Sequence, residues 1–260
     1  MFTSNQPRHL SLINKLSEIS EQVYTIIGCN TVFPGKIEDF FKKSPVIQAY
    51  FKKVLEAEKK VFGNIQFLPK NVSPLVLKSK DINLLNMKIL EPAFEADFYL
   101  VFGSAYLKGN LCKRLIAKRT INIHMGVSPY YRGSSTNFWA LYDERPEMVG
   151  ATIHLLSKGL DSGDILYHAF PKAIKADPFT YGMLAVRAAQ ESLIKKIKTG
   201  EIKKMRPTKQ DKTKEIRYTR NKDFTDKVVS EYLKNLPTKE DIFNSTVKRN
   251  MSLFINPHLI

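Results

Sequence analysis

Apolar and polar residues follow two different periods along this chain, and segments with the two periods follow one another. Apolar residues recur every three to four positions, as on one face of a helix, over residues 9–20, 45–62 and 178–198. Apolar runs rich in β-branched residues, typical of buried strands, cover residues 22–29, 96–102, 120–124, 149–155 and 165–169. This order predicts an α/β domain with a mostly parallel sheet covered by helices on both faces.

The two ends of the chain depart from this pattern. A domain of this class normally begins with a full buried strand, but only two residues precede the polar turn at residues 3–7. We therefore expect a first strand that is very short or truncated. Towards the C-terminus the sequence becomes polar and charged, with only short amphipathic pieces. We expect a main domain over residues 1–202 and a small C-terminal region over residues 203–260.

The composition is that of a protein with a buried core. The chain has 260 residues, of which 43% are hydrophobic and 11% aromatic. No apolar run approaches the roughly 20 residues that cross a bilayer, and the N-terminus lacks the features of a secretory signal. Cys29 and Cys112 lie far apart, so neither a disulfide scaffold nor a metal site is expected. These features predict a cytoplasmic protein with no membrane partner.

The net charge of +16 has two interpretations. Such an excess often indicates a nucleic acid, a phosphate-rich ligand or an anionic surface as the partner. It also arises from a lysine-rich bias that only keeps a protein soluble. The lysines recur in pairs on the polar sides of the expected helices, and no aromatic-interleaved RNA-binding motif accompanies them. We favour the second interpretation and keep tRNA as an alternative partner.

Candidate chemistry gathers at the end of the expected strand over residues 120–124. Side chains alternate along a strand, so Asn122 and His124 share one face while two isoleucines face the other way. A loop rich in Pro and Gly follows, which places the pair where ligands bind in open α/β sheets. Asp161 lies further on, in a Gly-rich segment where it serves either in catalysis or in the turn. His154 and His168 are expected to be packed core residues.

An amide, an imidazole and a carboxylate together suit the transfer of a small acyl group. The amide and the imidazole can donate to an oxygen that gains negative charge, and the carboxylate can orient the imidazole, raise its pKa and accept a proton. No Gly-x-Ser-x-Gly motif occurs, and neither cysteine is near the histidine in sequence, which favours direct attack by the substrate. No Gly-x-Gly-x-x-Gly or Walker A motif is present, so hydride and phosphoryl transfer are disfavoured.

Four motifs in order strongly resemble the 10-formyltetrahydrofolate-dependent formyltransferases. They are Asn122-Ile123-His124, Pro129-Tyr130-Tyr131-Arg132-Gly133, Gly150-Ala151-Thr152-Ile153-His154 and Gly159-Leu160-Asp161-Ser162-Gly163. The resemblance spans about residues 1–170 and is concentrated between residues 97 and 168. It implies a Rossmann-like catalytic domain and 10-formyltetrahydrofolate as the formyl donor.

The resemblance also implies roles for individual residues. Asn122 and His124 would polarise the formyl carbonyl, and Asp161 would hold His124 and relay a proton from the attacking amine. The pteridine ring would be bound mainly by the backbone of one loop, which corresponds here to Gly103, Ser104, Ala105, Tyr106 and Leu107.

Three groups within this family differ in the acceptor. Glycinamide ribonucleotide formyltransferases have a Gly-rich phosphate loop after the first strand, where this chain has the turn at residues 4–9. Methionyl-tRNA formyltransferases carry a C-terminal β-barrel domain, for which the residues after Met205 offer little strand alternation. The segment from Gly126 to Trp139 and the turn at residues 5–9 look most like the enzymes that formylate nucleotide-linked amino sugars.

We therefore expect a homodimeric amino-sugar formyltransferase of surface-polysaccharide synthesis. Arg8, Tyr130, Arg132 and Trp139 are candidates for contacts with the sugar, the diphosphate or the base, although a structural role suits each of them at least as well and Trp139 suits the core best. The alternatives are a methionyl-tRNA formyltransferase, a 10-formyltetrahydrofolate hydrolase, and a formyltransferase-like domain that only binds a partner.

Overall fold

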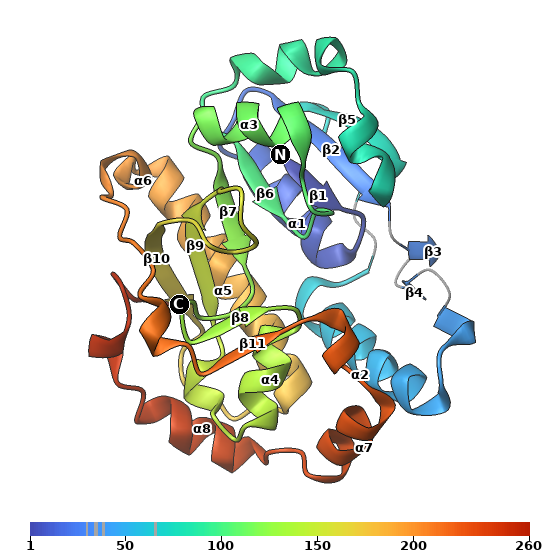
Figure 1. Ribbon diagram of the computed structural model, residues 1–260, viewed down its shortest axis with the longest axis vertical. Coiled ribbons are helices and arrows are strands. Elements are labelled where there is room, and N and C mark those ends of the chain that lie inside the picture. The colour runs from blue at the N-terminus through green and yellow to red at the C-terminus, as the bar shows by residue number, and fades with distance from the viewer. Residues whose placement is uncertain (30, 34–35, 38–39, 65–66) are drawn as a thin grey trace.

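An eight-stranded sheet runs through the molecule in the computed structural model, which describes residues 1–29, 31–33, 36–37, 40–64 and 67–260 (Figure 1). The strand order is β12-β10-β9-β7-β6-β1-β2-β5. All neighbouring strands pair in parallel except β9, which is antiparallel to both β7 and β10. The strands are β1 (Phe2–Ser4), β2 (Val23–Cys29), β5 (Val72–Lys78), β6 (Leu100–Phe102), β7 (Ile121–His124), β9 (Ala151–Leu155), β10 (Ile165–Phe170) and β12 (His258–Leu259).

Helices connect these strands and cover the sheet. The α-helices are α1 (Pro7–Ser17), α2 (Pro45–Phe62), α3 (Gly109–Ala117), α4 (Thr136–Tyr142), α5 (Pro178–Lys198), α6 (Glu201–Lys204), α7 (Asp226–Lys234) and α8 (Lys239–Val247). Short 3₁₀ helices cover Phe40–Lys42, Ser79–Leu84, Met87–Glu95, Pro146–Met148, Lys212–Lys214, Asn221–Asp223 and Met251–Leu253. Two small sheets pair β3 (Thr31–Phe33) with β4 (Lys36–Ile37) and β8 (Tyr131–Gly133) with β11 (Arg217–Thr219).

The sheet is buried on both faces. Apolar residues of α1 and α5 pack with Ile121, Ile123 and Ile153 in one cluster, while residues of α3 and the 3₁₀ segments before β6 pack with Phe2 and Val101 in another. Because Ile121 and Ile123 belong to the first cluster, the alternation along β7 turns Asn122 and His124 to the opposite face. The expected α/β architecture with a mostly parallel sheet is confirmed.

Some helices and strands have the bounds that the sequence predicts, and others begin or end at different residues. The helices expected over residues 45–62 and 178–198 have those bounds, and α5 begins where the Asp177 carboxylate accepts from two backbone N–H groups. The first strand has three residues, whereas the strand expected over residues 96–102 begins only at Leu100.

The C-terminal residues pair with strands and pack against helices of the rest of the molecule. Strand β12 adds to the main sheet beside β10, and β11 pairs with β8. Side chains of α7 and α8 join a third apolar cluster that also contains residues of α4 and α5. None of the helices among the described residues is long and apolar enough to cross a membrane.

Candidate functional site

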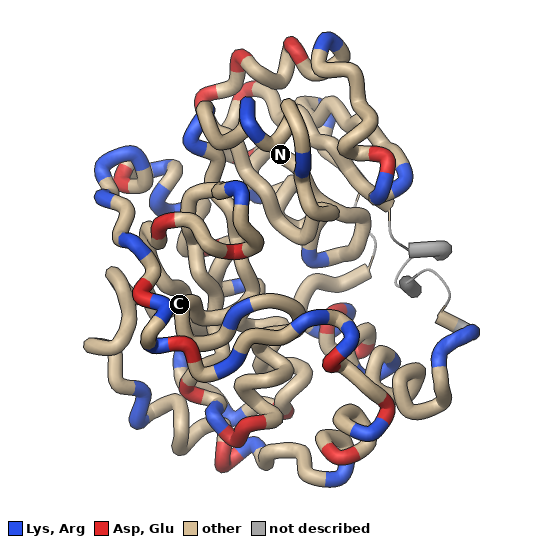
Figure 2. Tube along the Cα trace, in the orientation of Figure 1, with Lys and Arg blue, Asp and Glu red and all other residues tan. Residues whose placement is uncertain are grey.

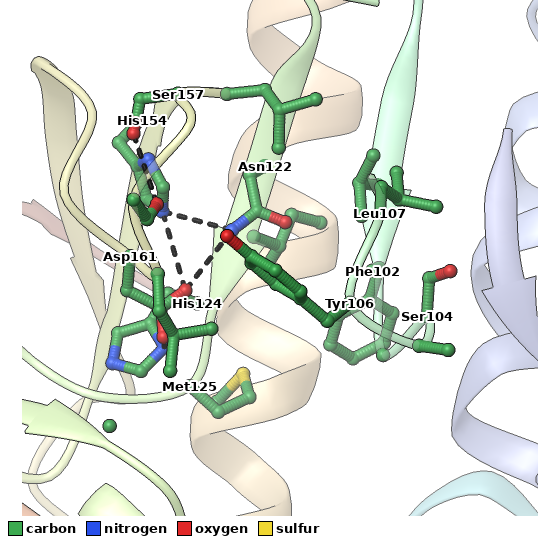
Figure 3. Close-up of a pocket in the computed structure, with 18 of the residues that line it drawn as sticks. Phe102, Ser104, Tyr106, Leu107, Asn122, His124, Met125, His154, Ser157 and Asp161 are labelled. Carbon is green, nitrogen blue, oxygen red and sulfur yellow. Dashed lines mark hydrogen bonds and ion pairs between the residues drawn. The ribbon is translucent and has the colours of Figure 1, made fainter. Parts of the chain in front are cut away.

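A cavity of about 340 Å³ opens beside the end of β7. Its walls come from the loop after β6, from β7, from the loop between β9 and β10, and from the start of α1. Figure 3 shows Asn122, His124, His154 and Asp161 on one side of this pocket and the loop after β6 on the other. The site therefore combines segments that lie far apart in the sequence.

Asp161 brings the polar groups of this pocket together. Its Oδ2 lies 3.2 Å from His124 Nδ1, and its Oδ1 accepts a long hydrogen bond of 3.4 Å from Asn122 Nδ2 (Figure 3). The side chains of His124 and Asp161 are only 8% and 12% exposed. The amide, imidazole and carboxylate singled out in the sequence thus converge in one pocket.

A fourth side chain, His154, completes the group. Asn122 and His154 are directly opposite in the antiparallel pair of β7 and β9. His154 Nδ1 lies 2.8 Å from the Leu155 carbonyl and must donate to it, so Nε2 is the acceptor for Asn122 Nδ2 at 2.9 Å. The same contact assigns the nitrogen of the Asn122 amide, because only that group can donate to Nε2.

His154 differs from the core residue that the sequence predicts. It is buried, but it fixes the plane of a pocket amide, and its Nε2 lies 3.8 Å from Asp161 Oδ1. The only signal for it was its place in the motif that begins at Gly150. His168 is the packed core residue expected: its Nε2 donates to the Ser128 carbonyl at 2.7 Å, and its Nδ1 accepts from the Ile255 N–H at 2.9 Å.

Burial decides the charge of His124. Burial lowers the pKa of His124 below its ordinary value, and the nearby Asp161 carboxylate raises it without overcoming that effect. The sequence-based expectation that Asp161 raises this pKa therefore describes one contribution and not the net result. Nε2 of His124 is buried and has no hydrogen-bond partner among the described residues. The imidazole is neutral at neutral pH.

Asp161 remains ionised in the same surroundings. Burial by itself raises the pKa of the Asp161 carboxyl group, but the neighbouring His124 and His154 and the charge of Arg132 together bring it below its ordinary value. The pocket therefore holds an anionic carboxylate beside a neutral imidazole. This pair can accept a proton, because the carboxylate is ionised and the neutral imidazole, with its Nδ1 hydrogen directed at Asp161, leaves the Nε2 lone pair free.

The loop that carries Asp161 is fixed from outside the pocket. Asp161 itself has a left-handed backbone, with φ of 46°. Gln210 Nε2 donates to the carbonyls of Asp161 and Gly163, each at 2.8 Å. A residue of the C-terminal region thus holds the backbone of the catalytic candidate, which no sequence motif indicated.

The loop after β6 forms the facing wall of the pocket. All five residues expected to bind the pteridine ring, Gly103 to Leu107, line the cavity. Asn83 fixes this loop, because its Nδ2 donates to the Tyr106 carbonyl at 2.8 Å and its Oδ1 accepts from the Lys108 N–H at 2.7 Å. The Tyr106 hydroxyl donates to the Lys158 carbonyl at 2.7 Å, which links the two walls. No motif in the sequence had indicated this role of Asn83.

The four candidates for substrate contacts lie in different surroundings. Arg8 lines the pocket, and its Nη1 lies 2.7 Å from Oε1 of the buried Glu58. Arg132 lies beside the pocket with its Nη1 2.9 Å from Glu215 Oε2, although its Nε is buried with no hydrogen-bond partner in the described part of the chain. Tyr130 and Trp139 are buried in the third apolar cluster and are not among the residues that line the pocket.

The comparison with known proteins identifies a family for part of the chain. Residues 78–197, somewhat under half of the chain, match the family model described as formyl transferase. This segment includes Asn83, the loop after β6, Asn122, His124, His154 and Asp161. The match agrees with the resemblance inferred from the motifs.

Curated relatives match shorter parts of the chain. A methionyl-tRNA formyltransferase from Desulforamulus reducens is 41% identical over 49 residues, which are 19% of this chain and 15% of the relative. Formyltetrahydrofolate deformylase 2, mitochondrial, from Arabidopsis thaliana is 33% identical over 104 residues, which are 39% of this chain and 31% of the relative. The chain thus spans less than a third of the length of either relative.

Solved structures share the fold over more of the chain. The N-formyltransferase from Helicobacter canadensis, in complex with folinic acid and dTDP-3-aminofucose, has a TM-score of 0.50 at 14% identity, covering 88% of this chain and 77% of its own. A phosphoribosylglycinamide formyltransferase from Streptococcus pneumoniae has a TM-score of 0.51 at 14% identity, covering 77% of this chain and 96% of its own. At such identities the likeness concerns the fold alone.

Proposed function

We propose that this protein transfers the formyl group of 10-formyltetrahydrofolate to the amino group of a nucleoside-diphosphate-linked amino sugar. The observation that carries the proposal is the convergence of Asn122, His124 and Asp161 in one pocket, opposite the loop from Gly103 to Leu107. The match of residues 78–197 to the formyl transferase family model supports the same chemistry.

The pocket has the features that a folate needs. Its wall opposite the polar group is a stretch of irregular backbone, and Ser104 Oγ is buried there without a hydrogen-bond partner among the described residues. Apolar side chains of Val101, Met125 and Leu107 complete the lining, which suits a flat heterocycle with polar edges. When bound, 10-formyltetrahydrofolate supplies the formyl carbon, whose bond to N10 breaks as the bond to the amine forms.

Each residue of the pocket has a role in this transfer. Asn122 Nδ2 gives one hydrogen to His154 and keeps the other in a long contact of 3.4 Å with Asp161, so this second hydrogen is available to an oxygen that gains negative charge. Asp161 takes the proton that the attacking amine loses, directly or through water, and returns it to the departing nitrogen. His124 Nδ1, 3.2 Å from Oδ2, holds the carboxylate in place.

Features of this chain support an amino sugar as the acceptor. The turn at residues 4–9 contains no glycine, unlike the phosphate loop of glycinamide ribonucleotide formyltransferases. Arg132 brings positive charge to the pocket, because its charge lowers the pKa of Asp161 despite the ion pair with Glu215, and positive charge suits a diphosphate. The sugar formyltransferase of Helicobacter canadensis shares the fold and carries both kinds of ligand.

Formyl transfer to defined acceptors tests the proposal. The protein is incubated with 10-formyltetrahydrofolate and a panel of UDP- and dTDP-linked 3-amino and 4-amino sugars, and tetrahydrofolate release and the mass of the sugar product are measured. We expect one of the sugars to gain a formyl group. Formylation of methionyl-tRNA alone contradicts the sugar assignment, and folate turnover without any amine identifies a hydrolase, the activity named for the relative from Arabidopsis thaliana.

Variants of the pocket test the mechanism. Replacing Asn122, His124 or Asp161 by Ala should each lower turnover by roughly two or more orders of magnitude while the protein stays folded. Asp164, in the same loop, is not among the residues that line the pocket, so Asp164→Asn is the matched control. Near wild-type turnover in the His124 variant would show that the roles are wrongly assigned.

A further inference from the structure

The small sheet of β8 and β11 has two different faces. The register pairs Arg132 with Tyr218, and the residues on either side of each point the other way. On the inner face Asp143 accepts hydrogen bonds from Arg217 at 2.8 and 2.6 Å and from the Tyr131 hydroxyl at 3.1 Å. These contacts anchor β11 to the core and leave the outer face free for another role.

Three side chains form this outer face, which we call the β8–β11 shelf: Arg132, Tyr218 and Arg220. Tyr218 is 42% exposed, and its ring centroid lies 5.7 Å from the Arg132 guanidinium carbon and 5.9 Å from that of Arg220. Arg132 has Glu215 as a carboxylate partner, whereas Arg220 has no ion pair among the described residues. An exposed aromatic ring beside two guanidinium groups offers a surface for stacking together with hydrogen-bond donors for an anion.

The shelf is continuous with the pocket. Gly133, the residue after Arg132, and Ser135, two positions further on, line the cavity. The charge of Arg132 reaches the reacting groups, because it lowers the pKa of both His124 and Asp161. A ligand whose amine reaches Asp161 can therefore extend along β8 and β11 with the part of the molecule that does not react.

The positive charge near the shelf favours a negatively charged ligand. Residues 209–222, which lead into and through β11, contain six Lys or Arg and two Asp or Glu. Figure 2 shows basic residues recurring along the segment that leads through β11. An aromatic ring beside cations in a positive region is the combination that binds a heterocyclic base linked to phosphates.

We propose that the β8–β11 shelf binds the nucleoside diphosphate part of the acceptor, with Tyr218 stacked on the base and Arg220 and Arg132 on the diphosphate. This inference rests on the proposed function for the identity of the acceptor. It adds Tyr218 and Arg220, which lie outside the segment that matches the formyl transferase family, to the residues that contact substrate.

Binding of bare nucleotides tests the shelf without any formyl transfer. The affinities of UDP, dTDP and inorganic pyrophosphate are measured by calorimetry for the wild type, Tyr218→Ala and Arg220→Ala. Tyr218→Ala should weaken UDP or dTDP roughly tenfold or more and leave pyrophosphate nearly unchanged, because it removes only stacking. Arg220→Ala should weaken all three. Phe67→Ala, at another exposed aromatic residue, and Arg206→Ala, at another exposed arginine, are matched controls that should bind as the wild type does.

The outcomes separate the shelf from the proposed function. If a nucleotide sugar is formylated but both shelf variants bind nucleotides as the wild type does, the shelf is wrong and the function stands. If no sugar is formylated but Tyr218→Ala selectively loses nucleotide affinity, the shelf stands and the acceptor is another nucleotide. A wild type that binds neither nucleotide, or an equal loss of pyrophosphate and UDP in Tyr218→Ala, overturns the shelf. Unchanged melting temperatures establish that both variants are folded.

Discussion

Replacing His154 with Phe tests whether this imidazole sets the plane of the Asn122 amide. In the wild type Asn122 Nδ2 donates to His154 Nε2 at 2.9 Å, while its contact with Asp161 Oδ1 is 3.4 Å long. Phe fills a similar volume but accepts no such hydrogen bond. The amide is then free to turn towards the carboxylate, and the hydrogen intended for the substrate oxygen is no longer held in place.

Two magnitudes follow from these contacts. The loss of a positioned oxyanion donor lowers kcat by about 10²–10³-fold, which is the upper bound, because the amide is misplaced and not removed. We therefore expect kcat to fall between about 10-fold and about 10²-fold, with KM little changed. His154→Phe also leaves the Leu155 carbonyl and the Asn122 amide without their partner, which costs about 1–3 kcal/mol of unfolding free energy for each group.

The assay separates the catalytic effect from the stability effect. Steady-state kinetics are measured well below the melting temperature, and unfolding is followed in urea for the same samples. His168→Phe is the matched control, because His168 is also a buried histidine with two hydrogen bonds, at 2.7 and 2.9 Å, to backbone groups. We expect it to lose comparable stability and to keep kcat. His154→Gln, which retains an acceptor, should recover part of the activity.

Either of two results would rule out this role of His154. If His154→Phe and His168→Phe lower kcat equally, His154 contributes only to the stability of the fold. If the entire loss in His154→Phe is in KM, the amide acts on the bound substrate as much as on the transition state, which contradicts its role as an oxyanion donor.

Three further predictions concern the surroundings of the pocket. Asn83→Ala removes both hydrogen bonds that hold the loop after β6, so the KM for the folate should rise several-fold in initial-rate measurements while the acceptor KM stays constant. Gly133→Ala should raise the acceptor KM and lower the melting temperature, because its φ is 94° and an added Cβ would lie 1.9 Å from the Thr219 carbonyl oxygen; unchanged values would contradict the close packing of β8 on β11. Burial lowers the pKa of His168 to about 4, and that of His124 also below its ordinary value, so the unfolded chain binds more protons than the folded one at acidic pH. The free energy of unfolding should therefore decrease as the pH falls below about 6.5, by up to about 1.4 kcal/mol per pH unit for each histidine, and urea titrations should show a shallower dependence in His168→Phe.

The part of the site that the sequence predicts is the part encoded locally. Asn122 and His124 could be placed on one face of a strand because period-two alternation needs only neighbouring residues. The helices α2 and α5 were predicted with the bounds that the structure gives them, since long amphipathic patterns between proline and lysine-rich ends are strong signals. The motif order then placed Asp161 in the same pocket.

The rest depends on contacts between distant segments. His154 lies opposite Asn122 because β9 is antiparallel to β7, and the sequence of neither strand indicates that direction. Gln210 and Asn83 act through hydrogen bonds to backbone carbonyls of remote loops, which leave no periodic trace in the sequence. Tyr130 and Trp139 were candidates for substrate contacts, but apolar packing against the C-terminal helices buries them.

The pairing of β11 with β8 also has a consequence for the order in which this molecule opens. The two strands form three residue pairs. They are far apart in the sequence: 83 positions separate Arg132 of β8 from Glu215, the ion-pair partner that lies just before β11. Such a distant and short contact gains little until the main sheet exists, so it should form late in folding and open first. In hydrogen exchange we expect the amides around β11 to exchange faster than those of β7 and β9. One half of the site then opens while Asn122, His124 and Asp161 stay assembled, which would give the acceptor of the proposed transfer a way in and its product a way out.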